Sequence, residues 1–264
     1  MLKQRIITAV ILAPLTISAI FYLPLDKFAA LFMAVMAIGA WEWGPLMGFA
    51  NKRRRLAFVL ATIILISALW YTLPLLQLWS NSGELHSGVS LVLWVAVAWW
   101  VLSAALTFLY PRYSKFWSSH RSVRGVFGWL TLIPTWLAFM VLRSNEYGQD
   151  SYHGAQLIMF LFLMVWSADV GAYFVGKSIG RHKLLPNVSP GKTLEGFIGG
   201  VVCACLFIAI AGYSLNWQTQ QYTLALIVTA IITTVSVLGD LNESMFKRQA
   251  GIKDSGSILP GHGG

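Results

Sequence analysis

The stretch Ala155–Gly176 reads AQLIMFLFLMVWSADVGAYFVG and carries a single charged side chain, Asp169. A helix of about 20 apolar residues crosses the ~30 Å hydrocarbon core of a bilayer, so this run predicts a transmembrane helix. A carboxylate inside such a helix is costly and usually functional. Asp169, Tyr173 and Lys177 would share one face of the helix. The alternative is that Asp169 only pairs with a basic side chain of a neighbouring helix.

Similar apolar runs occur along the whole chain, separated by short polar segments. They cover Ile6–Leu23, Phe28–Ala50, Leu56–Trp79, Val89–Tyr110, Gly125–Leu142, Phe197–Leu215 and Tyr222–Gly239. The chain of 264 residues is 57% hydrophobic and 11% charged, whereas soluble domains carry about 25% charged residues. We therefore predict an all-α, polytopic membrane bundle with about eight transmembrane helices. It would form a single membrane domain, residues 1–264, in which residues 1–154 supply the N-terminal helices.

The basic residues predict the orientation of this bundle. The net charge is +9, and an excess of Lys and Arg is typical of cytoplasmic loops, so we expect no nucleic-acid partner. All 19 Lys and Arg except Lys27 and Arg143 fall in segments on one side of the predicted topology. The positive-inside rule places that side, with the N-terminus and the C-terminal segment, in the cytoplasm. Any functional site is therefore expected at the cytoplasmic face.

The polar segment before the run Phe197–Leu215 contains Ser189-Pro190-Gly191-Lys192-Thr193. Gly-Lys-Thr resembles the end of a P-loop, but Pro186 stands where that motif needs its first glycine, which argues against a P-loop enzyme. We instead expect a glycine turn that leads into a helix N-terminus, where backbone N–H groups and Lys192 bind phosphate. The alternative is an ordinary Pro-Gly turn with a routine cytoplasmic lysine.

The C-terminal stretch mixes carboxylates, hydroxyls and basic side chains. If the last helix continues past Gly239, then Asp240, Ser244 and Lys247 lie on one face. Such a face would hold Mg²⁺ and a phosphate together. The residues from Lys253 onward are rich in glycine, and the backbone N–H groups of such a segment bind anions. One alternative is that Lys247 only forms a surface salt bridge with Glu243, four residues earlier. Another is that the glycine-rich residues are an unstructured cytoplasmic tail.

These segments resemble the signature of the phosphatidate cytidylyltransferases, also called CDP-diacylglycerol synthases. The matching residues are Ser244-Met245-Phe246-Lys247-Arg248, Lys253-Asp254 and Ile258-Leu259-Pro260-Gly261-His262-Gly263-Gly264, with support from Ser167–Tyr173 and Ser189–Phe197. The resemblance runs along the whole chain and is closest to the enterobacterial members. The family pattern continues past His-Gly-Gly to further Asp and Arg residues and a last transmembrane helix. The resemblance therefore predicts that the chain is truncated at Gly264.

The resemblance implies a Mg²⁺-dependent nucleotidyltransferase of phospholipid biosynthesis in the bacterial inner membrane, with residues 155–264 as the catalytic part. It would convert CTP and phosphatidic acid to CDP-diacylglycerol and pyrophosphate at the cytoplasmic face, as a homodimer. We assign Asp240 as a Mg²⁺ ligand and Asp169 as a second one. The remaining candidates are Lys192, Lys247 and Arg248 for the phosphates, Ser244 for orienting phosphate or metal, and Ser189, Lys253, Asp254 and His262 for the nucleotide.

Other classes of function remain open at this point. An ion-coupled transporter of a lipid or isoprenoid phosphate would use Asp169 and Glu42 as its relay. A non-catalytic scaffold would leave the clustered charges unexplained, and a lipid kinase would release CDP from CTP. The depth of the polar site in the bilayer distinguishes a transporter from an enzyme, because a transporter binds its substrate near the bilayer midplane. An enzyme that takes CTP needs its charges at the cytoplasmic rim.

Overall fold

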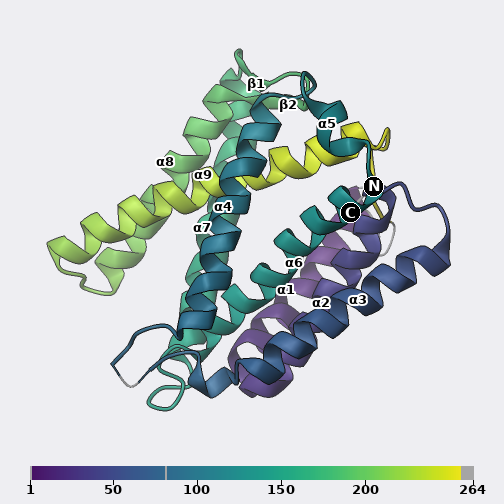
Figure 1. The fold of residues 1–264 in the computed structure, drawn as a ribbon. Helices are drawn as coiled ribbons and strands as arrows, with labels where there is room; N and C mark the ends of the chain where they lie inside the picture. The colour runs from purple at the N-terminus through teal and green to yellow at the C-terminus, as the bar shows by residue number, and fades with distance from the viewer. Residues whose placement is uncertain (1, 81, 257–264) are drawn as a thin grey trace. The chain divides into compact units, whose positions relative to one another are not determined.

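The computed structural model describes residues 2–80 and 82–256, and these are almost entirely helical (Figure 1). All of the predicted helices are present: α1 (Leu2–Tyr22), α2 (Leu25–Leu46), α3 (Lys52–Thr72), α4 (Ser87–Phe108), α6 (Arg121–Ser144), α7 (His153–Ile179), α8 (Leu194–Ser214) and α9 (Thr219–Gln249). Two short helices, η1 (Leu75–Gln77) and α5 (Ser114–Ser118), were not predicted.

Within the described residues, seven of these helices are long and apolar enough to cross a membrane, namely α2, α3, α4, α6, α7, α8 and α9. Helix α1 adds a shorter apolar part, Val10–Tyr22. The prediction of an all-α polytopic membrane protein is thereby confirmed. Helix α9 has 31 residues, which corresponds to about 46 Å of helix and exceeds the ~30 Å hydrocarbon core.

The ends of the helices differ from the predicted apolar runs where proline or glycine intervenes. Helix α3 ends at Thr72, because Pro74 follows and cannot continue a helix. Helix α2 ends at Leu46, shortly before Gly48, whose φ of +77° suits glycine. The last helix does continue past Gly239, as expected, so Asp240 and Ser244 both lie on α9.

Contacts between residues divide the chain into two compact units. The first comprises the described residues within Met1–Ser103, Arg112–Ile158 and Phe246–Gly264, and the second comprises Ala104–Pro111 and Met159–Met245. In the first unit, α2 packs against α3 and α6, and α3 packs against α6. The buried Trp136 fixes part of this packing, because its indole Nε1–H donates to the carbonyl oxygen of Ala29 at 3.1 Å.

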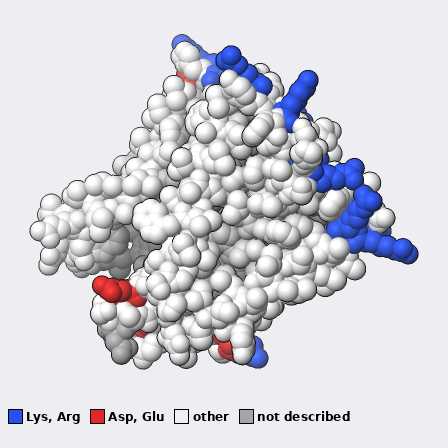
Figure 2. All heavy atoms as spheres, viewed as in Figure 1, with Lys and Arg blue, Asp and Glu red and all other residues white. Residues whose placement is uncertain are grey.

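The surface of each unit separates charge from apolar side chains. In the first unit, Lys and Arg gather at the end of the bundle where α3 begins, and the flank of the helices is uncharged (Figure 2). In the second unit, the visible basic side chains gather over a short hairpin that precedes α8 (Figure 2). An uncharged flank with basic ends is the pattern expected of helices that cross a bilayer.

Helices α7 and α8 of the second unit approach each other through glycines. A Cβ atom added at Gly171 would collide with Cys203 Cβ and would lie 2.8 Å from the carbonyl oxygen of Gly199. On α8, Gly196, Gly200 and Ala204 are all buried at intervals of four residues. Small residues at this spacing let transmembrane helices pack with their backbones in contact.

The hairpin consists of β1 (Lys183–Leu185) and β2 (Ser189–Thr193), paired antiparallel with Lys183 opposite Thr193. The predicted glycine turn at Ser189–Thr193 is therefore wrong in its local structure, since these residues form a strand. Pro190 is compatible with this strand because each strand of a two-stranded sheet has a free edge that needs no N–H donor. Val188 is 1% exposed and anchors the connection between the strands.

Candidate active site

The hairpin passes directly into α8, and polar contacts fix this junction. Thr193 is the N-cap of α8, and its Oγ1 accepts a hydrogen bond from the N–H of Gly196 at 3.2 Å. The N–H of Leu194 donates to the carbonyl oxygen of His182 at 2.8 Å. A hydroxyl N-cap satisfies a backbone donor that the first helical turn leaves free, so the start of α8 has a defined position relative to the hairpin.

Glu195 makes further hydrogen bonds at this junction, and the sequence did not predict them. Its carboxylate accepts hydrogen bonds from the N–H groups of Arg181 at 3.0 Å and His182 at 3.2 Å. The ring Nδ1 of His182 lies 2.6 Å from the same carboxylate. The available signal was an N-cap threonine followed by an acid in the first helical turn, which is a favourable place for a negative charge. Glu195 therefore holds the segment between α7 and β1 against the beginning of α8.

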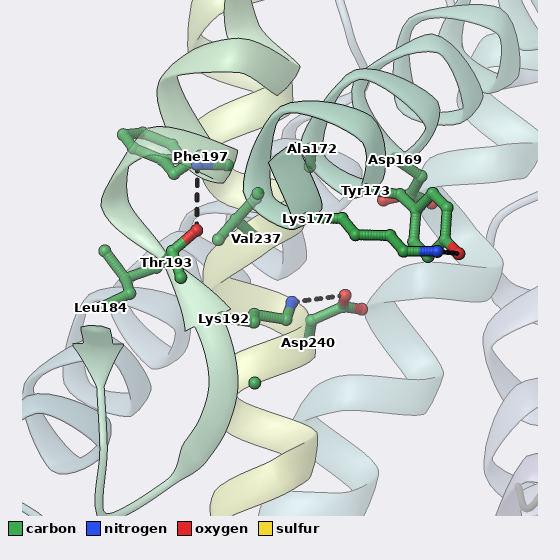
Figure 3. Close-up of a pocket in the computed structure, with 13 residues that line it drawn as sticks. Asp169, Ala172, Tyr173, Lys177, Leu184, Lys192, Thr193, Phe197, Val237 and Asp240 are labelled. Atoms are coloured by element: carbon green, nitrogen blue, oxygen red, sulfur yellow. Dashed lines mark hydrogen bonds and ion pairs between the residues drawn. The ribbon is translucent and has the colours of Figure 1, made fainter. Parts of the chain in front are cut away.

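The central charged contact of the second unit joins the hairpin to α9. Lys192 Nζ on β2 lies 2.6 Å from Asp240 Oδ2 (Figure 3). The side chain of Asp240 is 57% exposed and that of Lys192 is 29% exposed. An ion pair this open to solvent is weakly held, so both groups are available to a charged ligand.

Asp169, Lys192 and Asp240 line one pocket of about 380 Å³. Its other lining residues are Ala172, Tyr173, Gly176, Lys177, Leu184, Gly191, Thr193, Gly196, Phe197 and Val237. The volume lies within the ~300–1,000 Å³ usual for small-molecule sites. The pocket thus combines two carboxylates and two ammonium groups with an apolar wall, which suits an anionic ligand that binds together with a cation.

The face of α7 predicted from the sequence is the face that lines this pocket. Asp169, Tyr173 and Lys177 all belong to the lining, as their spacing indicated. Lys177 Nζ lies 3.4 Å from the hydroxyl of Tyr173, to which it donates, and 5.5 Å from the centre of the same ring (Figure 3). Tyr173 therefore keeps the ammonium group of Lys177 at the edge of the pocket.

The carboxylates of this pocket fit a Mg²⁺ ion better than a metal ion that needs three or more protein ligands. The described residues contain no group of three or more His, Cys, Asp and Glu side chains that could hold a metal ion, which disfavours an all-protein cage. Mg²⁺ usually takes one or two carboxylates and completes its shell with waters and substrate phosphates. Asp169 and Asp240, which face one pocket from α7 and α9, are compatible with that requirement.

Other predicted site residues lie outside the lining of this pocket. Ser244 follows Asp240 by one turn of α9, whereas Ser189 lies opposite Leu185 at the far end of β2. The rest are Lys247 and Arg248 in the last turn of α9, Lys253 and Asp254 in the exposed segment after it, and His262, which lies outside the described residues. None of the described members of this set lines the pocket, and their assigned roles stay predictions.

Glu42, the other carboxylate considered for a proton relay, belongs to the first unit. The backbone of Gly256 lies against it, because a Cβ atom added at Gly256 would be 2.5 Å from Glu42 Cδ. Glu42 is not among the described residues that line the charged pocket. Glu42 and Asp169 therefore belong to different units.

Comparison with known proteins identifies the family. The model of the cytidylyltransferase family matches residues 3–264. The phosphatidate cytidylyltransferase of Haemophilus influenzae is 38% identical over 276 residues, which cover 100% of this chain and 92% of that protein. The protein of the same name from Pseudomonas aeruginosa is 39% identical over 264 residues, which cover 100% of this chain and 90% of that protein. The chain therefore belongs to the cytidylyltransferase family.

Proposed function

We propose that this protein transfers the cytidylyl group of CTP to phosphatidic acid, forming CDP-diacylglycerol and pyrophosphate in phospholipid biosynthesis. The observation that carries the proposal is the pocket in which Asp169 and Asp240 face Lys192. Family membership and the similarity to curated phosphatidate cytidylyltransferases over the full chain support the same reaction. The membrane helices support a lipid as one of the two substrates.

The reaction depends on stabilising the negative charge of the phosphates rather than on proton transfer. A phosphate oxygen of phosphatidic acid attacks the α-phosphorus of CTP, and the bond from that phosphorus to the bridging oxygen breaks as pyrophosphate leaves. The attacking phosphate is already ionised near neutral pH, so no general base is needed. Lys192 and Lys177 would hold the phosphates in line and offset the negative charge on the leaving pyrophosphate, which is the main contribution a protein makes to such transfers.

The carboxylates have a separate role in this proposal. Asp240 and Asp169 would hold Mg²⁺, which supplies Lewis-acid neutralisation of phosphate oxygens when it is bound. In that arrangement Lys192 would hold the triphosphate instead of pairing with Asp240. The pairing seen between Lys192 and Asp240 is then the resting arrangement of two groups that separate when the substrates bind.

The depth of the pocket supports an enzyme over a transporter. Its lining includes the hairpin and the first turn of α8, with Gly196 and Phe197. These elements lie at the ends of membrane helices rather than at their centres, where a transporter site would lie. We propose that this end faces the cytoplasm of a bacterial inner membrane, where the basic segments belong and CTP is present. The homodimer stays a prediction, which light scattering of the protein–detergent complex would test.

The decisive experiment uses purified protein, labelled CTP, phosphatidic acid in detergent micelles and Mg²⁺, with and without EDTA. The expected result is lipid-soluble label and stoichiometric pyrophosphate, both lost with EDTA. Release of CDP with phosphorylated lipid would instead identify a kinase. Absence of any nucleotide turnover, in protein whose circular dichroism shows intact helices, would contradict the proposal and favour the transporter.

A further inference from the structure

A second pocket lies beside the charged one and differs from it in chemistry. It has a volume of about 230 Å³ and is lined by Phe108, Leu184, Phe197, Thr234, Val237, Leu238 and Leu241. All of these side chains are apolar except that of Thr234. The hydroxyl of Thr234 donates to the carbonyl oxygen of Ala230 at 2.7 Å, so its hydrogen bond is made within its own helix. The pocket is therefore suited to hydrocarbon.

The apolar and charged pockets share a wall. Leu184, Phe197 and Val237 line both of them. These three side chains come from β1, α8 and α9, and they lie on the side of the charged pocket that is away from Tyr173 and Lys177 (Figure 3). The apolar pocket therefore adjoins the charged pocket, which Lys192 lines, within the second unit.

We propose that the apolar pocket binds the first part of one acyl chain of the lipid substrate while the lipid phosphate lies in the charged pocket. This inference rests on the proposed function, because it takes a diacyl phosphate as the ligand. Methylene groups gain free energy when they leave water for apolar surroundings, and beyond the shared wall the lining of the charged pocket consists mostly of charged, polar and glycine residues. A bulk membrane lipid could also occupy the apolar pocket, but its presence would not link acyl length to turnover.

The shape of the apolar pocket then contributes to acyl selectivity. Thr234, Leu238 and Leu241 project from one face of α9 at intervals of three and four residues, and this face forms one side of the pocket. Phe108, at the end of α4, is 58% exposed and lies at its margin. A larger side chain on the α9 face should weaken the binding of a long acyl chain more than that of a hexanoyl chain, because the first part of the long chain fills the pocket whereas the short chain fills less of it.

The test compares dioleoyl and dihexanoyl phosphatidic acid as substrates of the wild type, Leu238→Trp and the control Val235→Trp. Val235 lies on the same helix but is 48% exposed and is not among the described residues that line either pocket. Leu238→Trp should lower the ratio of kcat/KM for the long lipid over the short one by about tenfold, the scale on which apolar pockets discriminate. Val235→Trp should leave that ratio within about twofold of wild type.

A second variant keeps the inference testable if Leu238→Trp does not fold. Phe108→Ala removes an apolar contact with the acyl chain at the margin of the pocket but little buried protein surface, so it should lower the same ratio by about threefold. An unchanged ratio in the folded variants, or an equal change in Val235→Trp, would overturn the acyl site while leaving the reaction itself intact. Failure of the proposed function looks different, because the wild type would then convert neither lipid.

Discussion

Arg143 in the first unit and Lys192 in the second both meet oxygen atoms, but these oxygen atoms differ in kind. The guanidinium of Arg143 donates to the backbone carbonyl oxygens of Ser151 at 2.8 Å and Leu23 at 3.2 Å. Arg143 is only 2% exposed. Lys192 instead meets the carboxylate of Asp240, which is more than half exposed. The two cations therefore differ in both partner and burial.

The same contrast extends to other arginines of the first unit. Arg124 donates to the carbonyl oxygen of Leu46 at 3.0 Å, and Arg55 donates to that of Phe49 at 2.8 Å. These carbonyl groups lie at and just beyond the end of α2, where a helix leaves its last acceptors without intrahelical partners. Arginines that donate to such backbone carbonyl oxygens stabilise the fold. A solvent-open pair such as Lys192 and Asp240 can be exchanged for ligands, so the partner of a basic residue indicates its function better than its charge does.

The strongest test of this contrast is Asp240→Asn. The amide keeps the size of the side chain but removes the charge that faces Lys192 and the proposed Mg²⁺. We expect kcat to fall by about 10²–10³-fold, the scale seen when one electrostatic group of an active site is removed, with the helical circular dichroism unchanged. The matched control is Asp26→Asn, an exposed carboxylate paired with Lys27 at 3.6 Å in the first unit. Wild-type turnover in Asp240→Asn would refute the assignment.

Arg143→Met is expected to lower stability and leave turnover unchanged, the reverse of Asp240→Asn. Methionine fills much of the volume but leaves the carbonyl oxygens of Leu23 and Ser151 without their donor, so we expect a loss of about 2–3 kcal/mol in stability. Thermal unfolding in detergent should show this loss, while turnover per folded molecule should match wild type. Arg53→Met is the control, because Arg53 is exposed. A large loss of kcat without a loss of stability would show that this arginine is not purely structural.

Much of the fold was predictable because lipid imposes a simple rule on sequence. A spanning helix needs a long apolar run, and each such run in this chain became a helix. The helix ends were less predictable, since they depend on single residues such as Pro74 and Gly48. The hairpin was missed because its strands are short and one contains Pro190. Nothing in their periodicity distinguishes such strands from a turn.

Residues of the candidate site were predictable where their placement in the sequence was unusual. Asp169 stood out because a carboxylate in an apolar run is unusual, and Asp240 stood out through its place at the end of the last run. Their convergence with Lys192 on one pocket depends on contacts among α7, α9 and the hairpin, which spacing along the chain does not encode. Glu195 escaped notice because a surface acid near a helix start has many ordinary roles.

Lys192→Met should have a smaller effect than loss of the carboxylate, since Lys177 also lines the pocket. We expect kcat/KM for CTP to fall by about 10–30-fold, mainly through a higher KM if the ammonium holds phosphate equally in the ground and transition states. Lys192→Arg should recover part of the loss because it keeps the charge. Lys183→Met, an exposed lysine on the neighbouring strand, should behave as wild type. Equal losses in both hairpin lysines would point to general attraction of nucleotide rather than to a specific contact.

The smallest effect is expected at Glu195, which acts on the site only through the position of the hairpin. Glu195→Ala removes the acceptor for the N–H groups of Arg181 and His182, so the strand that carries Lys192 should lose part of its orientation. A misplaced binding group costs rate because alignment is part of the barrier, and we expect kcat/KM for CTP to fall by about three- to tenfold. Glu195→Gln retains an acceptor oxygen and should recover most of the activity. If both variants lost stability and activity in proportion, Glu195 would resemble Arg143 rather than Lys192, and the carboxylate would belong to the fold instead of the site.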